Sequence, residues 1–130
     1  MHKIEAIIKR ERLGGVLEAL KGSKLNGLTV QEVHGFGRQK GYKEHYRGLQ
    51  IEVNLLPKVK LEIVLQDERV EEIVETIVQA ARSGESGEIG DGKIFVIPVA
   101  QAIRIRTRER GFAALEGFGP VEAGSEIAAH

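Results

Sequence analysis

The chain has 130 residues, 42% of them hydrophobic, which suffices for one domain with one apolar core but not for two. Its nineteen basic and nineteen acidic residues cancel, which argues against a protein that holds nucleic acid mainly by neutralising many phosphates. The absence of cysteine excludes disulfides, thiol catalysis and thiolate metal sites.

The compartment is predicted from what the chain lacks. It begins with an amphipathic segment, without a signal-peptide apolar stretch or anything near the ~20 apolar residues of a membrane span. A cysteine-free chain also fits a reducing environment. We therefore expect a cytoplasmic protein.

The first part of the chain predicts a strand, a helix and a second strand. Residues 3–9 alternate loosely between apolar and polar side chains, as a largely buried strand does. Residues 13–20 place apolar side chains at i, i+3, i+4 and i+7, and Lys21 and Gly22 supply a helix end. Residues 28–36 contain β-branched side chains and stop at glycines, which indicates a strand, and a long polar loop follows.

The second part predicts extended segments around one further helix. Residues 49–55 and 59–65 alternate on either side of Pro57, as an extended pair or one interrupted strand. Asp67 is expected to N-cap a helix whose apolar positions keep a 3.6-residue period up to Ala81. A glycine-rich loop over 83–93 then precedes a strand at 94–97 and a last strand from Ala102 to Thr107.

This order, βαββαβ, is that of a ferredoxin-like α+β domain, in which two helices cover one face of an antiparallel sheet. Because Val64 and its neighbours lie on the other face, we expect a second copy of the chain or a ligand to cover it. The domain is placed at residues 1–110. Residues 111–130 are rich in Gly and Ala without a sustained period, which predicts a flexible tail or one ordered by a partner.

The segment 35–41 combines glycines with cationic side chains. Its pattern, G-x-G-x-x-x-G, is one residue too long for a dinucleotide fingerprint and no helix follows, so a Rossmann site is excluded. Arg38, Gln39 and Lys40 between the glycines suit a phosphate, which binds open backbone amides and cations. A plain hairpin connection is the alternative.

The segment 87–93 matches the first half of a phosphate-binding P-loop. However, Ile94 stands where Ser or Thr would hold magnesium, and the segment leaves a helix and enters a strand, so NTPase activity is not expected. Phosphate binding by the glycine amides and Lys93, or a plain turn, both stay open. Arg104 and Arg106 share one strand face, which suits either an anion or a solvated edge strand.

Other functions find little support. The four histidines lack metal-ligand spacing and the carboxylates form no acid and base pair, so we expect no enzyme. An RNA-recognition module shares the βαββαβ order, but aliphatic residues replace its stacking aromatics, so no nucleic-acid partner is expected unless tight RNA binding is found.

Several ordered stretches together resemble the PII nitrogen-regulatory signal-transduction family over almost all of residues 1–108. They are Ile7-Ile8-Lys9, the run from Thr29 to Gly41, Tyr46-Arg47-Gly48, Leu56–Val64, Ile89–Phe95 and Ile103–Thr107. The resemblance implies a homotrimer of ferredoxin-like units. ATP or ADP would bind in clefts between subunits, and 2-oxoglutarate would bind beside Mg²⁺ and ATP.

The resemblance also implies roles for single residues. The positions on the phosphate side are Gly37, Arg38, Gln39, Gly90, Asp91, Gly92, Lys93, Arg104 and Arg106, and those around the base are Thr29, Glu62 and Val64. By the same resemblance, Gln39 would be the magnesium ligand and would contact 2-oxoglutarate, and Lys58 would pair with a carboxylate of 2-oxoglutarate.

The loop from about 37 to 55 corresponds to the family's T-loop, which docks onto partners through contacts such as Arg47. The implied partners are an ammonium transporter, N-acetylglutamate kinase or an adenylyltransferase, and membrane contact would occur only through a transporter. The alternative is a PII-like sensor of another anionic metabolite or nucleotide.

Departures from the family's pattern carry expectations too. The tyrosine or serine used for covalent switching is replaced by Ile51 or Leu49, and neither Tyr42 nor Tyr46 occupies the modified position. We therefore expect no nucleotidylation or phosphorylation there. The segment 83–88 looks longer than usual, so phosphate contacts in that loop can differ from those of the family.

Overall fold

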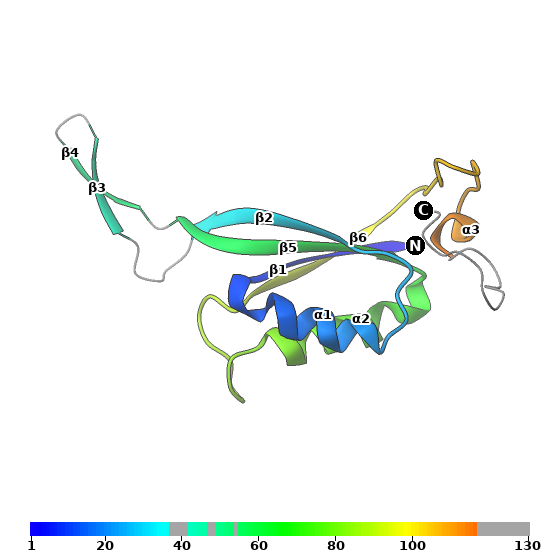
Figure 1. Ribbon diagram of the computed structural model, residues 1–130, viewed down its shortest axis with the longest axis horizontal. Coiled ribbons are helices and arrows are strands. Elements are labelled where there is room, and N and C mark those ends of the chain that lie inside the picture. The colour runs from blue at the N-terminus through cyan, green and yellow to red at the C-terminus, as the bar shows by residue number, and fades with distance from the viewer. Residues whose placement is uncertain (37–41, 47–48, 54, 117–130) are drawn as a thin grey trace.

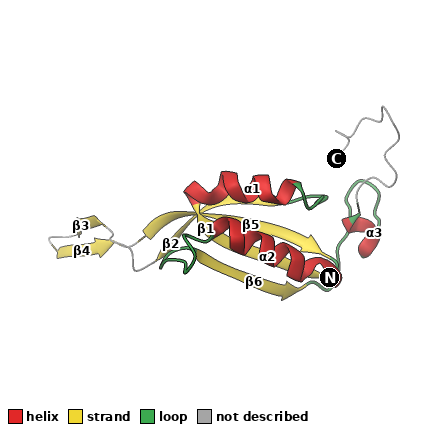
Figure 2. Ribbon diagram, turned by 90° about the horizontal axis from the view of Figure 1, so that it is seen from below, coloured by secondary structure: helices red, strands yellow, loops and turns green. Residues whose placement is uncertain are grey.

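The computed structural model describes residues 1–36, 42–46, 49–53 and 55–116. The main sheet has four antiparallel strands in the order β2-β5-β1-β6. These strands are β1 His2–Lys9, β2 Thr29–Phe36, β5 Leu55–Leu65 and β6 Gly92–Pro98. The helices α1 Leu13–Lys21 and α2 Val70–Ala81 lie side by side across one face (Figures 1 and 2). This is the ferredoxin-like α+β arrangement that the order of elements predicts.

The alternating apolar side chains of β1 and β5 form the floor of the core. Every second residue points toward the helices, which present their own apolar stripes in return. The fully buried side chains of 2% exposure or less are Ile4, Ala6, Ile8, Val16, Leu20, Val59, Leu61, Ile63, Ile73 and Ile77. Burying each large aliphatic side chain contributes about 1.5–3 kcal/mol, so this interface holds the sheet and helices together.

The predicted runs 49–55 and 59–65 belong to two strands, but these do not divide at Pro57: residues 49–53 form a strand of their own, and β5 runs without interruption through Pro57. Strand β1 pairs with β5 from Leu65 only as far as Lys58, whereas β2 pairs with it as far as Leu55. Residues 55–57 therefore have β2 as their single neighbour. Pro57 is tolerated there because no second strand needs its missing N–H.

Two shorter pieces lie at opposite ends of the main sheet (Figure 1). Beyond the β2–β5 ribbon, β3 Tyr42–Tyr46 and β4 Leu49–Val53 pair as a two-stranded antiparallel sheet. The prediction of a polar loop is therefore wrong for residues 42–46. They pair with β4 through backbone hydrogen bonds, which form without an alternating apolar pattern in the sequence. At the other end, the short helix α3 Phe112–Leu115 falls within the tail predicted over 111–130, and residues 117–130 lie outside the described part.

The expected last strand from Ala102 to Thr107 is not formed. The segment makes one isolated bridge, Ile103 to Arg110, and turns back through a bond from Arg108 N to Arg104 O of 2.7 Å. Alternation is a local property, whereas a strand also needs a partner strand, and this segment pairs with neither edge strand of the sheet, β2 or β6. Ile105 is 95% exposed, as expected of a side chain that nothing in the described chain covers.

Asp67 is not the N-cap of α2. A 3₁₀ turn, Asp67–Arg69, precedes that helix, and a second one, Arg10–Arg12, precedes α1. The Asp67 carboxylate instead lies 3.0 Å from the amino group of Met1 and 2.6 Å from Nδ1 of His2. The side chain thus ties the N-terminal strand to α2, a long-range contact that a capping pattern does not reveal.

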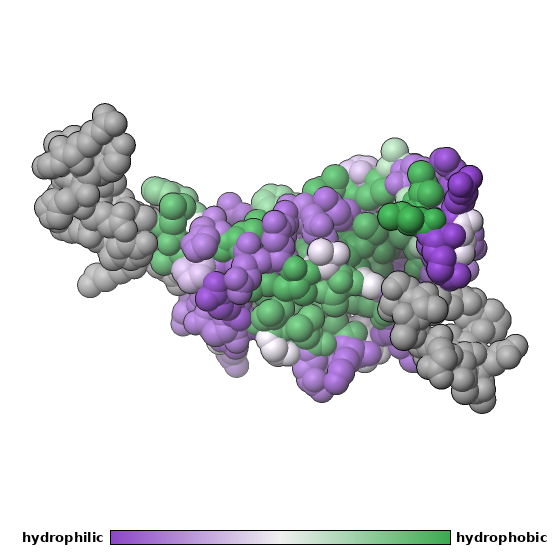
Figure 3. Space-filling view, turned by 45° about the horizontal axis from the view of Figure 1, so that its top comes forward, coloured by the Kyte–Doolittle hydropathy of each residue, from purple (hydrophilic) through white to green (hydrophobic). Residues whose placement is uncertain are grey.

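The sheet face opposite the helices mixes charge with apolar surface (Figure 3). Lys3 Nζ lies 3.2 Å from Glu5 and 3.3 Å from Glu62, and hydrogen bonds to both carboxylates raise its pKa. Beside this network Phe95 and Ile97 on β6 are 46% and 38% exposed. The expectation of an uncovered sheet face that carries apolar side chains is confirmed for the single chain.

Candidate functional site

The described site residues gather into two groups at opposite ends of the sheet. One group, Lys58 with Gly90, Asp91, Gly92 and Lys93, lies where β5 meets the loop before β6. The other group, Thr29, Glu62, Val64, Arg104 and Arg106, lines a cavity near the far end of β5. Six residues separate Lys58 from Val64 along one strand, which is about 20 Å at 3.3 Å per residue. One chain therefore does not bring all the predicted residues together.

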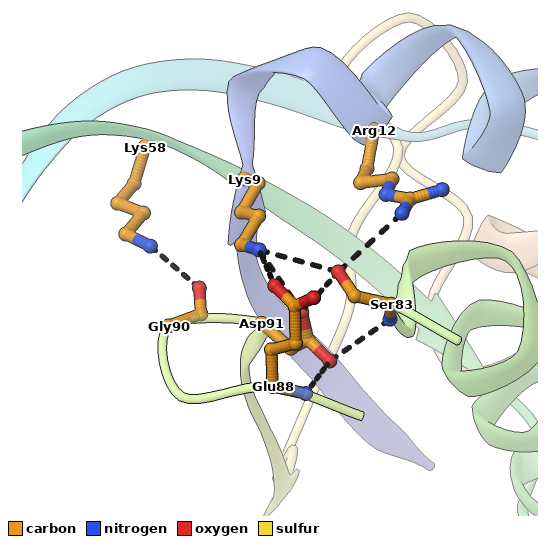
Figure 4. Close-up of polar contacts among 7 residues, drawn as sticks. All are labelled: Lys9, Arg12, Lys58, Ser83, Glu88, Gly90 and Asp91. Carbon is orange, nitrogen blue, oxygen red and sulfur yellow. Dashed lines mark hydrogen bonds and ion pairs between the residues drawn. The ribbon is translucent and has the colours of Figure 1, made fainter. Parts of the chain in front are cut away.

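Asp91 organises the loop between α2 and β6 (Figure 4). Its Oδ2 accepts hydrogen bonds from the backbone N–H groups of Ser83 and Glu88, both at 2.9 Å, and its Oδ1 accepts one from Ser83 Oγ at 2.7 Å. Burial alone would raise the pKa of this carboxyl, but the bonds from Ser83, Glu88 and Lys9 hold it well below its usual value. Asp91 is thus a charged clamp on the loop.

Lys9 completes the clamp from the last position of β1. Its Nζ lies 3.3 Å from Asp91 and 3.4 Å from Glu88, and it donates to Ser83 Oγ at 3.2 Å. Burial would lower the pKa of Lys9, but the two carboxylates outweigh it and raise that pKa. Arg12 also donates to Ser83, at 3.4 Å. The loop is therefore anchored to both β1 and the turn that precedes α1.

Lys58 faces the same loop, but its ammonium group is bound differently from that of Lys9. Its Nζ donates to the carbonyl of Gly90 at 2.6 Å, and the residue is only 8% exposed (Figure 4). Desolvation, and next the nearby charge of Lys9, lower its pKa. Among the described residues no carboxylate reaches ion-pair distance of Lys58. A buried cation in this state gains from an anion that can reach it.

Gly92 lets β6 approach β1 closely. It has a φ of +118°, and a Cβ at this position would lie 1.8 Å from the carbonyl oxygen of Ile7. Gly90 also has a positive φ, of 99°. These backbone conformations turn the chain sharply just before the exposed Lys93, which pairs with Ile7 in the sheet.

The cavity at the far end of β5 has a volume of about 940 Å³. Thr29 and Glu62 stand opposite each other on β2 and β5, so their side chains share one face of the sheet. The Glu62 carboxylate is held by Lys3 at 3.3 Å and by Lys60 at 3.8 Å. Such a volume, lined by apolar and polar groups, is of the size that holds a small ligand.

Arg104 and Arg106 both line this cavity but differ in their surroundings. The Arg104 guanidinium binds the Glu109 carboxylate at 2.9 Å, and its side chain is only 18% exposed. It also donates to the backbone carbonyls of Ala113, Ala114 and Glu116. Arg106 is exposed, and within the described ranges no hydrogen bond or ion pair of its side chain is found.

Four predicted residues, Gly37, Arg38, Gln39 and Arg47, lie outside the described residues. Conversely, the sequence reasoning missed Lys9, Ser83 and Asn26. The first two hold the Asp91 loop, and Asn26 Nδ2 donates to the carbonyl of Leu115 at 2.9 Å. Their sequence separations range from 8 to 89 residues, so only the fold brings these groups together.

A second cavity, of about 630 Å³, was also missed. It lies between α2 and the loop 83–93, with Val74, Val78 and Ile94 among its apolar lining residues.

No helix in the described part of the chain is both long and apolar enough to cross a membrane.

Comparison with known proteins identifies the family to which this fold belongs. The family model described as nitrogen regulatory protein P-II matches residues 1–109. Nitrogen regulatory protein P-II of Cereibacter sphaeroides is 59% identical over 111 residues, covering 85% of this chain and 96% of the relative. The Rhodospirillum rubrum protein of the same name is 57% identical with the same coverage. Nitrogen regulatory protein P-II 1 of Escherichia coli K12 is 54% identical over 115 residues, which is 88% of this chain and all of the relative.

The match over residues 1–109 thus places the chain among signalling regulators rather than enzymes. The chain belongs to the nitrogen regulatory protein P-II family. Members of this family regulate partner proteins in nitrogen metabolism.

Proposed function

We propose that this protein senses ATP or ADP together with 2-oxoglutarate and passes the result to partner proteins through its T-loop. The observation that carries the proposal is the presence of two cationic half-sites at opposite ends of one sheet. The Lys58 and Lys93 end offers glycine turns and cations for phosphate and carboxylate groups. The cavity end offers room for a base beside Arg104 and Arg106.

A homotrimer would complete the site. Half-sites about 20 Å apart on one chain cannot grip one nucleotide. When copies associate head to tail in a closed ring, the loop end of one copy meets the cavity end of the next, and three equivalent clefts result. The exposed apolar side chains of Phe95, Val96 and Ile97 supply surface that such contacts would bury.

Lys58 is the proposed partner of a 2-oxoglutarate carboxylate. A desolvated ammonium gains more from an arriving carboxylate than an exposed one does, because less water screens the pair. Binding would also reverse the lowering of the Lys58 pKa. The protein ligand proposed for Mg²⁺ is Gln39. A single protein ligand suits Mg²⁺, which is usually bound by one or two protein groups together with phosphate oxygens and water.

The response to ligands is proposed to be a shift between T-loop conformations. Lys58 is the last residue of β5 supported on both sides, and beyond it the β2–β5 ribbon leads to β3 and β4. A ligand that binds one conformation better than another shifts the population toward it, and couplings of about 1–3 kcal/mol are typical. The ratio of nucleotides and 2-oxoglutarate would then select the partner.

The proposed partners are an ammonium transporter, N-acetylglutamate kinase or an adenylyltransferase, met in the cytoplasm through the T-loop and Arg47. Contact with a membrane would occur only through the transporter. The family's role as a regulator in nitrogen metabolism supports this class of partner.

Calorimetry with ATP and Mg²⁺, with and without 2-oxoglutarate, tests the proposal. Lys58→Ala removes a charge-assisted contact worth about 1.5–3 kcal/mol, so 2-oxoglutarate binding should weaken about 10- to 150-fold. ATP binding without 2-oxoglutarate should change only a few-fold. Lys60→Ala is the matched control, because Lys60 lies on the same strand and face but contacts Glu62.

Two results would contradict the proposal. A wild-type protein that binds ATP with Mg²⁺ but ignores 2-oxoglutarate would be a sensor of another anionic metabolite. An equal loss in the Lys58 and Lys60 variants would remove Lys58 from the effector site.

A further inference from the structure

The half-site arginine Arg104 is held by the chain's own C-terminal residues. We propose that residues Glu109–Glu116, here called the C-terminal strap, occupy the Arg104 guanidinium in the ligand-free protein and are displaced when a nucleotide phosphate binds there. This proposal rests on the proposed function, because it concerns regulation of the same site.

The contacts of Arg104 are those of a filled anion site. Nη1 donates to the Glu109 carboxylate at 2.9 Å, while Nη2 donates to the carbonyls of Ala113 at 3.1 Å and Ala114 at 3.4 Å, and also to that of Glu116. A phosphate is bound by the same fork of guanidinium N–H groups. The strap and a phosphate therefore compete for Arg104.

The strap also fills part of the space that a ligand would use. Ala114, Leu115 and Glu116 line the same cavity as the predicted base-side residues Thr29 and Val64. The carbonyl of Leu115 is fixed from across this cavity by Asn26, at 2.9 Å. Release of the strap would thus expose the Arg104 guanidinium and free space in the cavity.

Within the described residues, the strap is held mostly by hydrogen bonds to its backbone. Its helix, α3, has four residues, and a helix of one turn is not stable by itself. Its anchors to other parts of the chain include Arg104, Asn26 and the bond from Gly111 N to the carbonyl of Ala102 at 2.9 Å. An incoming phosphate that takes Arg104 removes the contact shared by Glu109 and the helix carbonyls. Most of the contacts that remain among the described residues are neutral hydrogen bonds to the strap backbone, which are weaker than bonds from a guanidinium.

Strap closure lowers the apparent affinity for the ligand. If the open form alone binds phosphate, the apparent dissociation constant is the intrinsic one divided by the open fraction. Weakening the strap should therefore tighten nucleotide binding, the opposite of what loss of an ordinary binding residue does. Arg106, which the strap does not hold, would make the first contact with the anion.

The first test compares two single-charge variants by calorimetry with ADP in the absence of magnesium. Glu109→Gln removes the carboxylate that binds Arg104 Nη1, and should tighten ADP binding about three- to tenfold. Glu116→Gln removes one carboxylate of the strap, at the cavity wall, without removing the Glu116 carbonyl, and should change binding less than about twofold. Equally tighter ADP binding in both variants would show a general charge effect and would contradict the proposed role of the strap.

The second test follows hydrogen exchange of the strap amides in the full wild-type chain. The amides of Gly111, Ala114 and Glu116 donate to backbone carbonyls and should exchange slowly without ligand. Their exchange should accelerate with ADP and also with pyrophosphate, which has no base. Slower or unchanged exchange with both ligands would overturn the strap. Acceleration by pyrophosphate without any ADP binding would keep the strap and refute the proposed function instead.

Discussion

Replacement of Asp91 tests whether one carboxylate holds the loop before β6. Asp91→Ala removes three hydrogen bonds to a charged acceptor, two from backbone N–H groups and one from Ser83 Oγ. Bonds to charged groups contribute about 1.5–3 kcal/mol each when well buried, and less with partial exposure. With the side chain 18% exposed, we expect a total loss of about 2–3 kcal/mol in the free energy of unfolding.

The stability contributed by the Asp91 carboxylate should depend on pH in a definite direction. Because the folded protein lowers the pKa of Asp91, its contribution is fully present above the carboxyl's ordinary pKa near 3.9 and is lost as pH falls below it. The difference between wild type and Asp91→Asn should therefore be constant from about pH 5 to 7 and shrink below about pH 4. Guanidinium denaturation followed by circular dichroism, at one fixed protomer concentration, measures both quantities.

Two outcomes would refute the reasoning about Asp91. A loss below about 0.5 kcal/mol for Asp91→Ala would show that solvent replaces the loop contacts at no cost. A wild-type to Asp91→Asn difference that does not shrink at low pH would show that the charge is not the stabilising feature.

Two further predictions concern backbone space and covalent switching. Gly92→Ala should cost at least about 3 kcal/mol of stability, because its Cβ would strike the Ile7 carbonyl. Gly84→Ala, with a φ of +67° and open space around it, should cost about 1–2 kcal/mol when both variants are compared by guanidinium denaturation. Equal costs would contradict the steric argument. Because Ile51 and Leu49 replace the modifiable residues, the intact mass of the protein should not change on incubation with a uridylyltransferase. An added nucleotide would contradict that prediction.

The sequence predicted the elements that have a periodic apolar face. The helix predicted to follow Asp67 was found because its buried side chains recur every 3.6 residues, and it ends at Ala81 as predicted, but it begins only at Val70, after a 3₁₀ turn. The strands β1 and β5 were predicted for the same kind of reason. The segment from Ala102 to Thr107 also alternates, but it pairs with neither edge strand of the main sheet, β2 or β6, and a single-sequence pattern does not contain that information.

The candidate site was predicted only in part, since its chemistry depends on contacts between distant segments. Glycine spacing and nearby cations pointed to the loop 87–93 and to Arg104. The sequence did not show that Asp91 would be fully occupied by the loop itself, or that the chain's own carbonyls would reach Arg104. Those contacts join segments whose relative placement follows from the packing of the helices on the sheet.

Strand β5 extends beyond the point where its pairing with β1 ends, and this has a mechanical consequence. Up to Lys58 the strand is flanked on both sides, so bending it would strain two ladders of hydrogen bonds. From Pro57 outward only one ladder remains, and a two-stranded ribbon bends and twists more easily than a wide sheet. Lys58 therefore lies at the boundary between the stiff four-stranded sheet and the more flexible β2–β5 ribbon. A small rotation at that position swings β3 and β4, at the end of the ribbon, through a larger arc (Figure 1).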